Sequence, residues 1–257
     1  MTESRSASRS PGGGGWLLLA IRMSAQAAAA LLPPEPPWRT GLACARRLTL
    51  PGFVLVAAAA MVVTSYYHSP AFHAWLDGIA AFRMRWGLAY GAVAQALCAG
   101  LIPFLYLHFH PATRASHPAR HGVFFVLFWA CKGLEVDLFY RLQAVMFGDG
   151  PELASILPKV AVDQFIYNPL FAAPIAVLVY AWKDAGWSWA EPLADLRSPR
   201  WYYRRVLPVM VAVWAVWVPA VSCVYALPLA LQLPLCSLVN CFWVILFSLM
   251  TAPERTA

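Results

Sequence analysis

The sequence predicts an all-α membrane protein, a polytopic bundle of about six transmembrane helices, on three observations. The 257-residue chain is 61% hydrophobic and 12% charged, whereas soluble domains average about 45–50% apolar and about 25% charged residues. Its apolar residues are gathered into long runs, and a helix needs about 20 such residues to cross the hydrocarbon core. Finally, its basic residues concentrate on alternate connections between these runs.

Six apolar runs are candidates for membrane spans. The predicted spans are 49–66, 86–109, 122–147, 155–182, 205–227 and 230–251. The first run is short, and the last two are joined by a tight connection at Leu227 and Pro228. Five spans therefore stay an alternative to six.

The distribution of charge predicts the orientation of the bundle, because cytoplasmic flanks are enriched in Lys and Arg. With six spans, one side carries the basic residues of 1–47, 114–120, 183–205 and the C-terminal tail. The other side carries Arg83 and Arg85, beside Asp77, Asp149 and Glu152. We therefore expect both termini on the positive side, which would be cytoplasmic or matrix-like.

The chain divides into one membrane domain and two tails. Residues 1–47 predict a disordered or weakly structured basic tail, 48–251 the transmembrane domain, and 252–257 a short C-terminal tail. The Arg- and Ser-rich start faintly resembles an organelle transit peptide. We prefer a disordered tail or a start of translation at Met23, which would leave residues 1–22 untranslated.

Composition and motifs argue against several functional classes. The net charge of +7 comes mainly from residues outside the apolar runs, and no nucleic-acid-binding motif accompanies it. Four histidines lie close together near a predicted membrane face, at His108, His110, His117 and His121. No H-E-x-x-H motif or cysteine ligand set supports them. We expect the lipid bilayer as partner, and no nucleic acid, metal, cofactor or catalysis.

Charged and polar residues interrupt the third and fourth predicted spans. They are Lys132, Glu135, Asp137 and Arg141 in the third, and Lys159, Asp163 and Gln164 in the fourth. A charge at the bilayer centre costs about 2.5–3.5 kcal/mol on insertion scales, so these groups should face the bundle interior and pair. Residues three or four apart share a helical face. The predicted pairs are Lys132 with Glu135, Asp137 with Arg141, and Lys159 with Asp163; pairing across helices, such as Asp163 with Arg141, is the alternative.

These charges support two hypotheses. They line a polar path or water-filled cavity between the third and fourth helices, or they are structural ion pairs that hold the helices in register. Lys159 lies near a helix end, where its long side chain could also reach the interface.

Two motifs lie in the same spans. In GLEVDLFY, Gly133 is followed by Phe139 and Tyr140, and KVAVDQFIYNP has the pattern K-x-x-x-D-Q-x-x-x-x-P, which ends at Pro169. Further along, a third set of residues follows in order: Trp214, Trp217, Pro219, Pro228, Trp243 and Ser248. Over residues 120–251 the chain resembles the Mpv/PMP family of small mitochondrial inner-membrane and peroxisomal membrane proteins. It departs from the family pattern at Leu134 and Gln232, and Pro219 falls one residue late.

This resemblance implies a helical membrane bundle without catalytic activity, acting as a weakly selective channel or small-solute pore. It favours a functional role for Asp163 and for the pair formed by the third and fourth helices. We therefore expect a pore first, a scaffold second and a membrane-embedded enzyme last. The solute, and assembly as a homo-oligomer, stay open. We expect the cell inner membrane in a bacterial host, and a mitochondrial inner or peroxisomal membrane in a eukaryotic one.

Overall fold

The computed structural model describes residues 36–251, and within this range every regular element is helical. Five helices are long and apolar enough to cross a membrane. They are Trp38–His68, Leu88–Phe109, Leu153–Asp184, Leu207–Tyr225 and Leu229–Leu249. The predicted fold class, a transmembrane helical bundle, is confirmed.

The first helix, α2, spans Pro37–His68 and begins on a proline, a residue favoured at the first helical position. Residues 37–47 are therefore helical, and the predicted boundary of the N-terminal tail at residue 47 was too late. Ala45 and Leu48 are buried, because this segment packs into the bundle. The remainder of both predicted tails, 1–35 and 252–257, lies outside the described residues.

A second helix, α3 (Pro70–Trp86), occupies what the sequence presented as a connection. The Ser69 hydroxyl caps it by accepting a hydrogen bond from the backbone N–H of Phe72 at 3.4 Å. Gly87, with a φ of +54°, ends α3, and glycine takes this backbone conformation without steric cost. The chain then continues through α4 (Leu88–Gln95), the π-helical segment Ala96–Leu101 and α5 (Ile102–Phe109).

The central helix, α6, spans Gly122–Phe147 after a short 3₁₀ turn at Ala119–His121. Its 26 residues extend about 39 Å at about 1.5 Å per residue, which is enough to cross hydrocarbon. Its four charged residues lie close together in the middle of the helix, within 132–141, and this clustering sets it apart from the five apolar helices. The four are Lys132, Glu135, Asp137 and Arg141. The count of six spans therefore stays a prediction.

The remaining chain forms a second group of helices. The run Leu153–Asp184 consists of α7 (Leu153–Val162), the π-helical segment Asp163–Ala172 and α8 (Ala173–Asp184). Two short helices follow, α9 (Ala190–Leu196) and α10 (Trp201–Arg205). The last two are α11 (Leu207–Tyr225) and α12 (Leu229–Thr251). The break at Leu227 and Pro228 separates α11 from α12, so these two runs are not one span.

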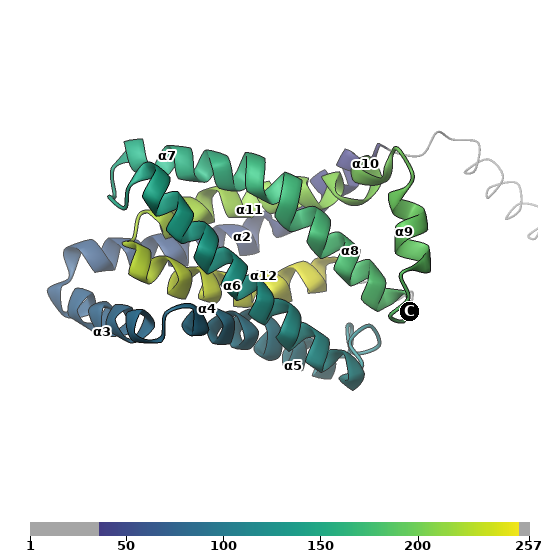
Figure 1. Ribbon diagram of the computed structural model, residues 1–257, viewed down its shortest axis with the longest axis horizontal. Coiled ribbons are helices and arrows are strands. Elements are labelled where there is room, and N and C mark those ends of the chain that lie inside the picture. The colour runs from purple at the N-terminus through teal and green to yellow at the C-terminus, as the bar shows by residue number, and fades with distance from the viewer. Residues whose placement is uncertain (1–35, 252–257) are drawn as a thin grey trace, which may run out of the picture. The chain divides into compact units, whose positions relative to one another are not determined.

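Successive long helices run in opposite directions (Figure 1). The start of α2, the α5–α6 connection and the α8–α11 connection lie at one end, and these segments carry most of the basic residues. The α6–α7 connection at the opposite end carries Asp149 and Glu152. This asymmetry agrees with the predicted separation of charge between the two sides.

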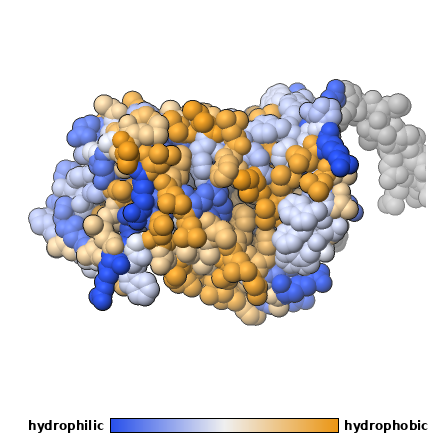
Figure 2. All heavy atoms as spheres, viewed as in Figure 1, coloured by the Kyte–Doolittle hydropathy of each residue, from blue (hydrophilic) through white to orange (hydrophobic). Residues whose placement is uncertain are grey.

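The face of the bundle shown in Figure 2 is largely apolar in the middle and more polar toward both ends. Large hydrophobic side chains are exposed along the helices, among them Phe53, Leu127, Val145, Ile166 and Leu170. In water such a surface would be strongly unfavourable, whereas hydrocarbon is its natural solvent.

Helices α4 and α6 approach each other through two glycines. A Cβ atom on Gly133 would lie 2.1 Å from the carbonyl oxygen of Gly91. Small residues allow this backbone contact, as at many helix interfaces in membranes.

Candidate functional site

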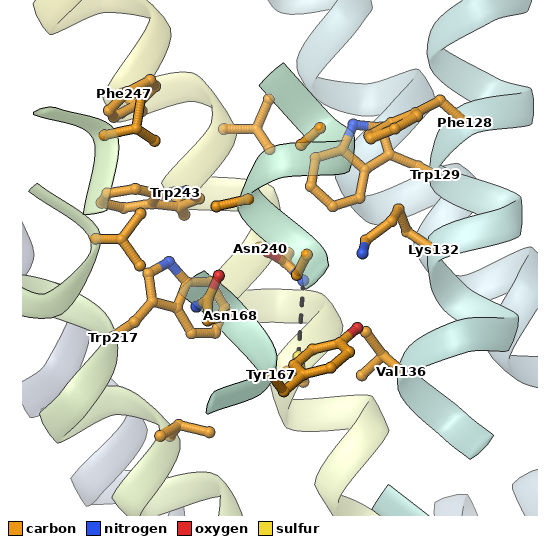
Figure 3. Close-up of a pocket in the computed structure, with 18 of the residues that line it drawn as sticks. Phe128, Trp129, Lys132, Val136, Tyr167, Asn168, Trp217, Asn240, Trp243 and Phe247 are labelled. Carbon is orange, nitrogen blue, oxygen red and sulfur yellow. Dashed lines mark hydrogen bonds between the residues drawn. The ribbon is translucent and has the colours of Figure 1, made fainter. Parts of the chain in front are cut away.

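A cavity of about 400 Å³ lies among α6, the π-helical segment 163–172, α8, α11 and α12. Its wall is largely aromatic, and Figure 3 shows Trp129 of α6 facing Trp217 and Trp243 of α11 and α12. Polar groups interrupt this wall: Lys132, Asp163, Gln164, Asn168 and Asn240. The cavity therefore lies on the seam between the third and fourth predicted spans, where the sequence predicted a polar path.

Asp163 is the carboxylate among the described residues that line this cavity, and it is 6% exposed. The Tyr225 hydroxyl donates a hydrogen bond of 2.6 Å to its Oδ2, and Gln164 Nε2 donates one of 2.9 Å to its Oδ1. Gln143 Nε2 in turn donates to the Tyr225 oxygen at 2.8 Å. Within residues 36–251, no Lys or Arg forms an ion pair with Asp163, so neutral donors alone contact it.

Lys159 does not pair with Asp163, contrary to the prediction. Its side chain is fully buried, its Nζ has no hydrogen-bond partner among the described residues, and the Tyr225 ring lies 5.7 Å away. Hydrogen bonding changes from α to π at Asp163, and the i, i+4 relationship that places two side chains on one face holds for the α form. The predicted alternative partner of Asp163, Arg141, contacts Asp137 instead.

Trp214 supplies to the π-helical segment a hydrogen-bond donor that Pro169 cannot provide. A π-helix would bond the carbonyl of Gln164 to the N–H of residue 169, but proline has no N–H. The indole Nε1 of Trp214 donates to this carbonyl at 2.7 Å. The Pro169 carbonyl itself accepts a hydrogen bond of 3.0 Å from the Tyr202 hydroxyl. The irregular backbone of this wall is thus satisfied from α10 and α11.

Lys132 and Glu135 form the predicted pair, and a third residue joins them. The Lys132 ammonium and the Tyr167 hydroxyl both donate to Glu135 Oε1. Phe139 stacks on the Tyr167 ring with centroids 4.0 Å apart. Lys132 points from α6 into the cavity (Figure 3), and its charge is balanced by Glu135.

Asp137 and Arg141 also form their predicted pair, at 3.1 Å, but neither lines the cavity. Asp137 is fully buried and contacts Arg83 Nη2 at 2.5 Å. Arg83 is 3% exposed although its sequence position suggested an outer connection. Arg83 was not among the predicted site residues, because this part of the chain was expected to be a connection and α3 was not predicted. The available signal was a charged side chain inside that helix.

The residues that resemble the family motifs lie at different places in the fold. Tyr140 is buried against Tyr225, with ring centroids 5.2 Å apart. The ring centroids of Trp217 and Trp243 are 6.2 Å apart. Ser248 lines the cavity. Pro219 lies inside α11, and Pro228 forms the α11–α12 turn, where its carbonyl accepts a hydrogen bond from the N–H of Leu231.

Among the residues that the structure describes, no three His, Cys, Asp or Glu side chains are grouped so that they could hold a metal ion, and this includes the four histidines. His108 Nδ1 lies 2.7 Å from the carbonyl oxygen of His117, and His117 Nδ1 lies 3.0 Å from that of Thr113. Burial lowers the pKa values of His117 and His121 below the usual 6.5, and the charge of Lys183 lowers them further. These rings therefore favour the neutral form.

Comparisons with protein-family models, curated proteins and solved structures gave no match. The fold and the apolar helices define the class: the chain is an integral membrane protein built as a helical bundle.

Proposed function

We propose that this chain is a pore or carrier for small solutes, and that the cavity between α6 and the run 153–184 is part of the route. The observation that carries this proposal is a space of about 400 Å³ inside an apolar bundle, with charged and amide side chains in its wall. Charged residues within transmembrane segments are rare, and those that face a bundle interior mark substrate and ion pathways. The resemblance to the Mpv/PMP family, which stays a prediction, points in the same direction.

The break in helical geometry beside the cavity supports this proposal. Interrupted helices build solute sites in many transporters, because irregular backbone is tolerated in a membrane where it borders a cavity. Here the π-helical segment 163–172 begins at Asp163 and forms one wall.

The test is conduction by the purified protein in a planar bilayer separating unequal concentrations of KCl. Asp163→Asn removes a negative charge from the wall at constant size, so the reversal potential should shift toward that of the anion. Arg141→Gln is the matched control, because it alters a charge in the same bundle outside the cavity. Silent bilayers, together with no flux of a solute panel into proteoliposomes by folded protein, would contradict the proposal.

A scaffold without transport is the second candidate, and the Arg83–Asp137–Arg141 cluster favours it. This cluster joins α3 to α6 away from the cavity, as a purely structural ion pair would. Strong coupling of Arg83 and Asp137 in stability, combined with no solute flux by the folded protein, would favour the scaffold.

A further inference from the structure

The two charged side chains that line the cavity, Lys132 and Asp163, do not pair with each other. Lys132 is paired with Glu135, which accepts its hydrogen bond. Asp163 receives hydrogen bonds from the Tyr225 hydroxyl and the Gln164 amide, both neutral. The wall therefore retains one carboxylate without a contacting cation among the described residues. A buried carboxylate in this state favours a positively charged ligand.

The hydrogen-bonding capacity of Asp163 and Gln164 is also incompletely used, and the unused groups are acceptors. A carboxylate has about four lone-pair sites, and two described donors contact Asp163. Gln164 Oε1 is buried in a side chain only 1% exposed and has no partner among the described residues. Both side chains line the cavity. A protonated primary amine carries three donors and no acceptor, which matches this deficit.

The rest of the wall is suited to an apolar body. Trp129, Tyr167, Trp217 and Trp243 present aromatic rings to the space (Figure 3). Aromatic faces attract organic cations through the ring quadrupole. A volume of about 400 Å³ lies within the usual range of about 300–1,000 Å³ for small-ligand sites.

We propose that the cavity binds a protonated organic amine with an aromatic or aliphatic body, whose ammonium group contacts Asp163 and Gln164. The claim that such an amine is the transported solute rests on the proposed function, whereas the claim that the cavity binds it does not. Lys132 already has Glu135 as its counter-ion, so we expect the cavity to favour the amine over an anion.

The test is equilibrium binding to the purified full chain in detergent micelles, by isothermal titration calorimetry. Three matched probes share a phenyl ring: 2-phenylethylamine, phenylalanine and 3-phenylpropionate. We expect the amine to bind more tightly than the zwitterion, and the acid to bind most weakly. Equal or tighter binding of the acid would overturn the proposal. Tightest binding of phenylalanine would also overturn it, because Lys132 would then hold a carboxylate.

Two variants locate the ammonium group. Asp163→Asn should weaken binding of 2-phenylethylamine by about tenfold or more, since a charge-assisted hydrogen bond is lost, while Arg141→Gln should leave it unchanged. Unchanged affinity in folded Asp163→Asn would overturn the assignment. The probe series on the unaltered chain decides the amine proposal even where this variant does not fold.

The failures of the two proposals are distinguishable. Amine binding without flux through proteoliposomes would overturn transport and keep the ligand class. Flux of neutral or anionic solutes without amine binding would overturn the ligand class and keep transport.

Discussion

Trp214 and Gln164, 50 positions apart in the chain, are joined by a hydrogen bond of 2.7 Å from the indole Nε1 to the backbone carbonyl. The bond fills the place of the N–H that Pro169 lacks. A wall of the cavity thus depends on one indole of α11, and this dependence can be measured.

We expect Trp214→Phe to destabilise the protein by about 1–3 kcal/mol, because a buried carbonyl loses its donor. Thermal unfolding in detergent, followed by circular dichroism, measures the change. Trp75→Phe, at a tryptophan that is 61% exposed, is the control. Adding Pro169→Ala should recover part of the loss, because alanine supplies an N–H; no recovery would argue against the π-helical explanation.

The Arg83–Asp137 pair gives a second prediction. Asp137→Asn leaves the buried Arg83 without its counter-ion, and breaking such a pair costs about 3–5 kcal/mol. Arg141→Gln should cost less than about 1 kcal/mol, because its side chain is 43% exposed and Asp137 keeps Arg83. Denaturant unfolding in micelles compares the two. Equal effects would mean that Arg83 does not hold Asp137.

The Gly91–Gly133 contact gives a third prediction, which concerns helix packing. Gly133→Ala places a Cβ atom against the Gly91 carbonyl, which is backbone and cannot rotate away. We expect a loss of about 1–3 kcal/mol or more, as for other overpacked sites. Gly78→Ala, also in a helix, meets nothing within 4 Å and should be neutral or stabilising by up to about 1 kcal/mol. Similar melting temperatures for the two variants would refute the close approach.

The α5–α6 connection gives a prediction on pH. The pKa values of His117 and His121 are lowered in the folded protein, first by burial, so the unfolded chain binds more protons near pH 6. Stability should then decrease as the pH falls from about 6.5 through the lowered folded pKa values. Unfolding at pH 7.5 and 5.5 measures this, and the double variant His117→Asn/His121→Asn should flatten the dependence. The exposed His68→Asn is the control; an equal flattening there would contradict the assignment.

The sequence alone was sufficient to predict the features that depend on residues close together in the chain. Long apolar runs predicted the membrane helices, because crossing hydrocarbon imposes a length and a composition. The spacing of three or four residues predicted two ion pairs, Lys132 with Glu135 and Asp137 with Arg141, because the α-helix fixes which neighbours meet.

The partners that determine the candidate site come from far along the chain. Asp163 contacts Tyr225, 62 positions away, and Asp137 contacts Arg83, 54 positions away. Helical periodicity carries no information on such contacts, since they depend on which helices become neighbours. The failed prediction for Lys159 has a local cause, because the change to π-helical bonding at Asp163 alters the register that the spacing rule assumes.

The backbone contact between Gly91 and Gly133 also restricts how the protein can move. Where two helices touch without an intervening layer of side chains, neither can rotate or slide independently, and α4 and α6 should behave as a single rigid body. The opposite wall contains the π-helical segment 163–172. Its hydrogen bonding is already irregular, and Pro169 has no N–H with which to restore a regular pattern. Any widening of the enclosed space should therefore come from bending at residues 163–172, which makes that stretch the place to attach spectroscopic distance probes.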